Sequence, residues 1–251
     1  MKTKLSLMDL YSVGAHRGNH KSRQNPKLKS YIHSVDRNQI CIIDLVKTIE
    51  SLNKAMDLME SLALKKRQVF VVGTSKYLGT YTTDFIKAFV SEPMPYVDNG
   101  WVGGTLTNWT TVRKTLKTLD KLENIKNNAK FYDELSRNEQ LGIDRELEKK
   151  LARFGGLKNL KTNRPGAILI LDTVKNQNAI LEAEVNNVPI ISLTNLNTVL
   201  LPKSLEHSII FNNTSMEAVK MITGELLNAY NSGFEQGSVL AEENNKVKKD
   251  N

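Results

Sequence analysis

Short hydrophobic runs of strand length recur along the chain. They lie at residues 40–45, 69–72, 167–171, 189–193 and 208–211. Several are rich in Ile and Val and do not alternate with polar residues, which is typical of parallel strands covered on both faces. The runs therefore predict a buried, mainly parallel sheet.

Segments with helical periodicity lie between these runs, at residues 48–64, 80–90, 177–185 and 215–230. In the first segment, the apolar residues that share one stripe are Ile49, Leu52, Ala55, Met56, Met59 and Ala63. Strands that alternate with helices imply right-handed crossovers. We therefore expect an open α/β sheet flanked by helices.

The stretch 107–160 has a different pattern. It contains no strand-like run, and its apolar residues recur at helical spacings: Val112, Leu116, Leu119 and Leu122, then Leu135, Leu141, Leu147 and Leu151. Asn127-Asn128 interrupts the series, and Gly155-Gly156 ends it. Two charged helices with narrow leucine seams predict an inserted antiparallel, coiled-coil-like hairpin. We expect it to project, either as a docking surface or as a plain structural arm.

These patterns predict four parts along the chain. Residues 1–106 form the first part of the α/β domain with a basic N-terminal loop, and 107–160 form the hairpin. Residues 161–240 complete the α/β domain. Residues 241–251 are polar and lack periodicity, so a disordered tail is expected there.

Charge is distributed unevenly over the 251 residues, which carry a net charge of +8. Residues 1–30 hold seven Lys and Arg against one acid, and residues 112–161 hold thirteen against eight. The rest of the chain is slightly acidic. Cations and backbone donors in a glycine-containing loop suit a phosphate backbone, although a solvated surface loop has the same composition.

Several classes of protein are excluded by composition. The single cysteine, Cys41, rules out a disulfide framework and a multi-cysteine zinc site. No apolar run approaches 18 residues, so no membrane contact is expected, and the N-terminus lacks the apolar core of a secretory signal.

Candidates for catalysis are weak, and we expect no catalytic, cofactor or metal site. The turn 72–76 follows a strand where a phosphate loop would lie, but it matches no nucleotide motif, and a tight turn with an exposed Lys76 is favoured. Gly103-Gly104 allows close approach of either a ligand phosphate or the protein's own sheet. Asp44 and Asp172 end strand-like runs, where carboxylates sometimes hold Mg²⁺ or a ribose.

Five stretches, in order over nearly the whole chain, resemble the bacterial and organellar ribosomal protein S2 family. They are Gly14-Ala-His-Arg-Gly18 with Asn25-Pro-Lys-Leu-Lys29; Ile42-Ile-Asp-Leu-Val-Lys-Thr48; Phe70-Val-Val-Gly-Thr74 with Met94-Pro-Tyr-Val97 and Trp101-Val-Gly-Gly-Thr-Leu-Thr-Asn108; Arg145-Glu-Leu-Glu-Lys149 with Phe154-Gly-Gly-Leu157; and Pro165-Gly-Ala-Ile-Leu-Ile-Leu-Asp172 with Asn176, Ile180, Glu182 and Asn187-Val-Pro189.

The resemblance implies a Rossmann-like α/β domain with a helical hairpin and a non-catalytic role. Members of the family lie on the back of the small ribosomal subunit, contact rRNA and neighbouring ribosomal proteins, and in bacteria help to hold ribosomal protein S1. The chain departs from the family at Arg17, Asn19 and Gln24, where aromatic residues and His are usual. It also lacks the acidic residues expected after position 194, which argues against a cation site there.

A structural rRNA-binding protein, acting as a single copy, is thus the leading hypothesis. The predicted RNA-binding residues are Arg17, Asn19, His20, Lys21, Arg23, Asn25, Lys27, Lys29, Lys76, Arg113, Lys114, Lys117 and Lys121. The expected location is a bacterial ribosome in the cytoplasm, or alternatively an organelle-encoded mitochondrial or plastid ribosome. Two rival functions stay open: a sugar-phosphate or nucleotide-binding α/β enzyme, and an RNA-binding or adhesion module that acts away from the ribosome.

Overall fold

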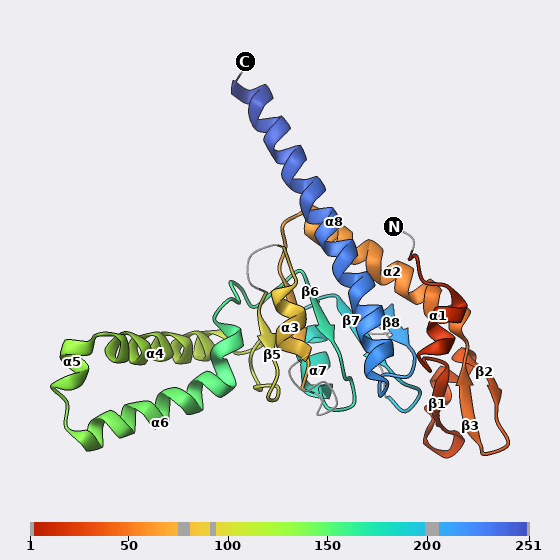
Figure 1. Ribbon diagram of the computed structural model, residues 1–251, viewed down its shortest axis with the longest axis horizontal. Coiled ribbons are helices and arrows are strands. Elements are labelled where there is room, and N and C mark those ends of the chain that lie inside the picture. Colours follow the sequence, from red (N-terminus) through yellow and green to blue (C-terminus); the bar gives the residue numbers. More distant parts are fainter. Residues whose placement is uncertain (1–2, 75–80, 91–93, 199–205, 250–251) are drawn as a thin grey trace.

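A five-stranded parallel sheet forms the centre of the protein (Figure 1). The computed structural model describes residues 3–74, 81–90, 94–198 and 206–249. The strands are β4 (Val69–Val72), β5 (Tyr96–Val97), β6 (Ala167–Ile170), β7 (Ile190–Thr194) and β8 (His207–Ile210), in the order β5-β4-β6-β7-β8. The predicted α/β, Rossmann-like class is confirmed.

Both faces of this sheet are covered, as the unbroken apolar runs predicted. Val69 and Val71 pack in one cluster with helices α2 (Leu45–Leu64), α3 (Tyr81–Lys87) and α8 (Met216–Lys249). Phe70 and Val72, their alternating neighbours, pack in a second cluster with α7 (Gln177–Val185) and the base of the hairpin. Every residue of β4 is therefore buried.

The first apolar run was placed wrongly in the parallel sheet. Strand β3 (Ile40–Ile43) is the centre of a separate antiparallel sheet, between β1 (Arg17–His20) and β2 (Ile32–Val35). Cys41 and Ile43 are buried, whereas Ile40 is exposed, so only one face of this strand is covered. The run of four consecutive apolar residues did not show that this strand is covered on one face only, rather than on both.

The N-terminal segment is folded rather than a loop. Helix α1 (Leu7–Ser12) precedes β1, and two short 3₁₀ helices, η1 (Lys21–Arg23) and η2 (Pro26–Tyr31), lead into β2. We call residues 14–43 the N-terminal module. A Cβ on Gly18 would lie 2.7 Å from the carbonyl oxygen of Cys41, so only glycine lets β1 approach β3 here.

The hairpin projects from the end of the parallel sheet opposite the N-terminal module (Figure 1). It consists of α4 (Trp109–Asn127), the short α5 (Ala129–Asp133) and α6 (Arg137–Phe154), followed by the 3₁₀ turn η3 (Gly155–Leu157). Near the tip, Asp144 binds Lys126 Nζ at 2.7 Å and accepts a hydrogen bond from the Tyr132 hydroxyl at 2.8 Å. Fewer leucines are buried between α4 and α6 than the sequence predicted, because Leu141 and Leu151 are each 39% exposed.

Helix α8 extends to Lys249, where the sequence predicted a disordered tail from residue 241. Residues 238–249 contain no Gly or Pro, and seven of these twelve residues are Ala, Leu, Glu or Lys, which favour helices. Such residues propagate a helix that packing has already nucleated, since each added residue gains a backbone hydrogen bond. The buried contacts of α8 with α2 supply that nucleus.

Gly156 joins the hairpin to the sheet, and its replacement by Ala should destabilise the protein. A Cβ there would lie 2.3 Å from the carbonyl oxygen of Tyr96, in β5, so backbone must shift. We expect a loss of about 2 kcal/mol in the free energy of unfolding, measured by urea denaturation.

Gly142→Ala is the matched control, because nothing lies within 4 Å of its added Cβ on helix α6. This variant should gain up to about 0.8 kcal/mol from helix propensity. Equal effects of the two substitutions would contradict the close packing at Gly156.

Candidate nucleic-acid interface

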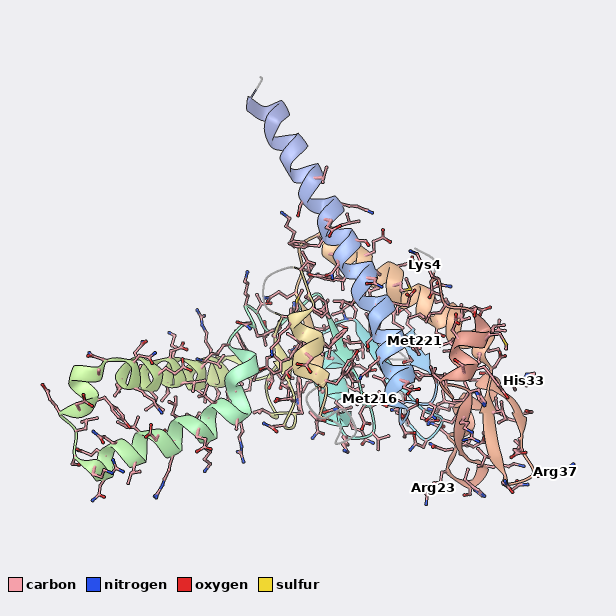
Figure 2. All side chains as sticks on the ribbon, viewed as in Figure 1. Lys4, Arg23, His33, Arg37, Met216 and Met221 are labelled. Carbon is pink, nitrogen blue, oxygen red and sulfur yellow. The ribbon has the colours of Figure 1, made fainter. Side chains whose placement is uncertain are left out.

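The N-terminal module carries an exposed basic surface. It consists of Arg17, Lys21, Arg23, Lys27 and Lys29, which come from β1, η1 and η2. None of these five side chains forms an ion pair within the described part of the chain, so their charge is available to a partner. Figure 2 shows Arg23 and Arg37 at the lower end of the module, away from helix α1.

The three uncharged residues predicted to contact RNA have more internal roles. Asn25 caps η2 by accepting from the Lys27 backbone N–H at 3.0 Å, and it donates to the Thr198 carbonyl at 2.8 Å. His20 Nδ1 lies 2.8 Å from Ser22 Oγ. Asn19 is half-buried in β1. These residues shape the module that presents the cations, and Asn25 in particular is engaged at both ends of its amide.

A second basic surface runs along α4 of the hairpin. Arg113, Lys117 and Lys121 recur every four residues and therefore share one stripe of the helix, with Lys114 beside it. All four are exposed, and none has an ion-pair partner among the residues that the structure describes. Other hairpin cations differ, since Lys158 pairs with Glu123 and Asp120 of α4.

The turn after β4 packs against the body of the protein. Thr82 Oγ1 donates to the Gly73 carbonyl at 3.0 Å, and Thr74 Oγ1 donates to Asn176 Oδ1 at 2.9 Å. A Cβ on Gly73 would lie 2.2 Å from Thr82 Oγ1, so the glycine serves internal packing. Lys76, a predicted RNA contact, lies outside the described residues.

The carboxyl edge of strands β6 and β7, where open α/β sheets bind ligands, is filled by protein. The hydroxyls of Thr173, Thr194 and Thr198 are buried and bind one another at 2.5–3.0 Å. Leu196, fully buried, lies in the same loop and packs against the N-terminal module. This edge therefore docks the N-terminal module.

The two strand-end aspartates act as local caps. Asp44 Oδ1 accepts from the Val46 N–H at 3.0 Å and begins α2, and Asp172 Oδ1 accepts from the Val174 N–H at 3.1 Å. Across the described residues, no three His, Cys, Asp or Glu side chains lie close enough together to hold a metal ion.

The glycine loop 101–107 is held by one carboxylate, which resolves the choice that the sequence left open. Glu182 of α7 accepts from Trp101 Nε1 and the Gly104 N–H, both at 2.8 Å. It also accepts from the Leu106 N–H at 3.0 Å, and from the N–H and hydroxyl of Thr107 at 3.3 Å. The loop's partner is thus the protein itself. Burial raises the pKa of Glu182, but these hydrogen bonds together bring that pKa below its usual value.

Sequence reasoning did not single out Glu182 as a functional side chain. The residue stood only within a stretch of family resemblance, and the available signal was a carboxylate on a helix opposite a glycine loop rich in backbone donors. Because the loop leads directly into α4, Glu182 positions the base of the hairpin and its basic stripe.

Comparison with known proteins agrees with this architecture. The family model for ribosomal protein S2 matches residues 10–233. The chain belongs to the ribosomal protein S2 family. A protein of Psychromonas ingrahamii named small ribosomal subunit protein uS2 is 33% identical over 240 residues, which cover 95% of each chain. The uS2 protein of Sulfurimonas denitrificans is 33% identical over 229 residues, covering 91% of this chain and 85% of that relative.

Membership of the S2 family covers both basic surfaces, because residues 10–233 include the N-terminal module and the whole hairpin. The described helices include none that is long and apolar enough to cross a bilayer.

Proposed function

We propose that this protein is a structural constituent of the small ribosomal subunit, which binds rRNA and neighbouring ribosomal proteins during translation. The observation that carries the proposal is a pair of exposed basic surfaces, on the N-terminal module and on the hairpin. These two elements lie at opposite ends of the parallel sheet (Figure 1), and buried threonines fill the ligand edge of that sheet. The names of the S2 relatives support the same role.

The mechanism is electrostatic and geometric rather than catalytic. Each Lys or Arg that approaches a phosphate releases condensed counterions, which makes binding favourable and strongly dependent on salt. Contacts at two separated surfaces fix both position and orientation, whereas one surface would leave the protein able to rotate. The sheet between the two surfaces holds the rRNA segments that they bind at a fixed separation.

The compartment follows from the same proposal: the cytoplasm of a bacterium, or an organelle that encodes its own ribosomal proteins. Ribosomal protein S1 is a candidate neighbour. The rival enzyme would bind a sugar phosphate or nucleotide at the turn after β4, and the internal hydrogen bonds of Gly73 and Thr74 disfavour it.

Sedimentation of a cell lysate on a sucrose gradient tests the proposed function. The protein should comigrate with small subunits in about equimolar amount, and high salt should release it as the phosphate contacts are screened. A protein found only in the soluble fractions at low salt would refute the proposal.

A further inference from the structure

A groove with acidic character lies at the amino edge of the parallel sheet, where strands β7 and β8 begin. Its deeper part is a cavity of about 370 Å³ between α2, the end of α7 and the starts of β7 and β8. A shallower hollow of about 600 Å³ adjoins it, since both are lined by Leu58, Glu206 and His207. The hollow continues over α2 to Tyr31.

The walls of the cavity combine apolar surface with uncompensated polar atoms. Leu58, Val188, Pro189 and Ile190 supply the apolar part. Glu184 Oε1 and His207 Nδ1 are shielded from solvent, and neither has a hydrogen-bond partner in the part of the chain that the structure describes. Removing one carboxylate oxygen from water without giving it a hydrogen-bond donor costs free energy. The binding of a cation in the cavity would therefore be favoured.

The charge of the groove is opposite to that of the chain as a whole. Its ionisable lining comprises three acids, Asp57, Glu184 and Glu206, against one base, Lys54. Burial lowers the pKa of His207, so the ring adds no charge near neutral pH. An RNA phosphate would be repelled here, whereas a lysine or arginine side chain would be attracted.

We propose that this groove docks a basic segment of a neighbouring ribosomal protein, with one Arg or Lys side chain inserted into the cavity. The aliphatic part of such a side chain fits the walls at Leu58 and Pro189, while its charged end meets Glu184 and Glu206. The rest of the segment lies along the hollow over α2. The inference rests on the proposed function, because it assigns this edge to protein and the two basic surfaces to rRNA.

Photo-crosslinking in assembled small subunits tests the groove. Lys54, exposed on α2 beside the hollow, is replaced by p-benzoylphenylalanine in the full-length chain. The expected product joins the chain to a Lys- or Arg-containing peptide of another ribosomal protein. The double variant Glu184→Gln/Glu206→Gln should lower the yield about tenfold, as expected when a charge pair is removed.

The double variant Glu134→Gln/Glu148→Gln removes the same number of charges from exposed positions on the hairpin; it is the control and should leave the yield unchanged. Crosslinks to rRNA, no protein product in subunits that contain the chain, or a yield unaffected by the Glu184→Gln/Glu206→Gln variant would each overturn the groove assignment. Subunit occupancy is measured separately in the same gradients. Loss of occupancy by the wild-type chain would refute the ribosomal function itself, whereas normal occupancy with a failed crosslink refutes only the groove.

Discussion

Replacement of Glu182 by Ala should release the loop 101–107 and loosen the base of the hairpin. Five donors from this loop converge on the carboxylate, and no other described acceptor binds them. The donors of Trp101, Gly104 and Leu106 are shielded at least in part, so each costs free energy when left without a partner, whereas water can reach Thr107. We expect a loss of about 3 kcal/mol in the free energy of unfolding.

Two measurements check this prediction. Urea denaturation gives the loss in stability, and tryptophan fluorescence reports the environment of Trp101, whose indole N–H binds Glu182 in the wild type. Glu184→Ala is the matched control, because it removes the same charge from the same helix at a carboxylate with an unpaired oxygen. Removal of the shielded, unpaired oxygen acts in the stabilising direction, so this control should lose no more than about 0.5 kcal/mol. Equal losses in the two variants would show that Glu182 does not hold the loop.

Acidification should reduce the difference in stability between the wild type and Glu182→Ala. Hydrogen bonds to its carboxylate hold the folded-state pKa of Glu182 below its ordinary value. The stabilisation from ionised Glu182 is therefore fully present above the unfolded-state pKa of about 4.3, and it is lost as the pH falls through the folded-state value. The stability difference between the wild type and Glu182→Ala should shrink in that window. A difference that grows on acidification would contradict the lowered pKa.

The sequence predicted those parts of the fold in which local pattern and tertiary packing agree. Helix α7 has the bounds that were predicted, and β4 coincides with the apolar run at residues 69–72. Strand β3 shows the opposite case, because an apolar run shows that a strand is buried without showing which strands it pairs with. The two-residue β5 was missed since so short a strand has no periodicity.

The sequence predicted which charged residues form the candidate interface, but it did not predict the contacts that hold them in place. The clustering of Arg and Lys in residues 1–30 identified the exposed cations, because charged side chains are rarely buried without a partner. Composition could not show that Asn25 is a helix cap bound to Thr198, since that contact spans 173 positions of the chain. The role of Glu182 depends on a similar long-range contact.

Removal of the five cations of the N-terminal module should weaken rRNA binding by orders of magnitude. The variant replaces Arg17, Lys21, Arg23, Lys27 and Lys29 with Ala; all five are exposed and without ion pairs among the described residues, so the fold should persist. If each neutralises one phosphate, the log–log slope of affinity against salt should become shallower by about 3.5 to 4.5 units. Filter binding to purified small-subunit rRNA measures this slope. The salt concentration is varied between about 50 and 200 mM, the range over which such slopes are steep.

The control removes Lys65 and Lys87, two exposed cations on the body outside both basic surfaces. The two variants are compared by the change in salt slope per cation removed. If only the net charge mattered, this change per cation would be the same in both variants. We expect the control to leave the salt slope close to that of the wild type, while the module variant also loses occupancy in sucrose gradients. Unchanged occupancy of a correctly folded module variant would remove the N-terminal module from the interface and leave the α4 stripe as its main contact. Since α4 offers four exposed cations, the salt dependence that remains should then have a slope of about 2.8 to 3.6 units.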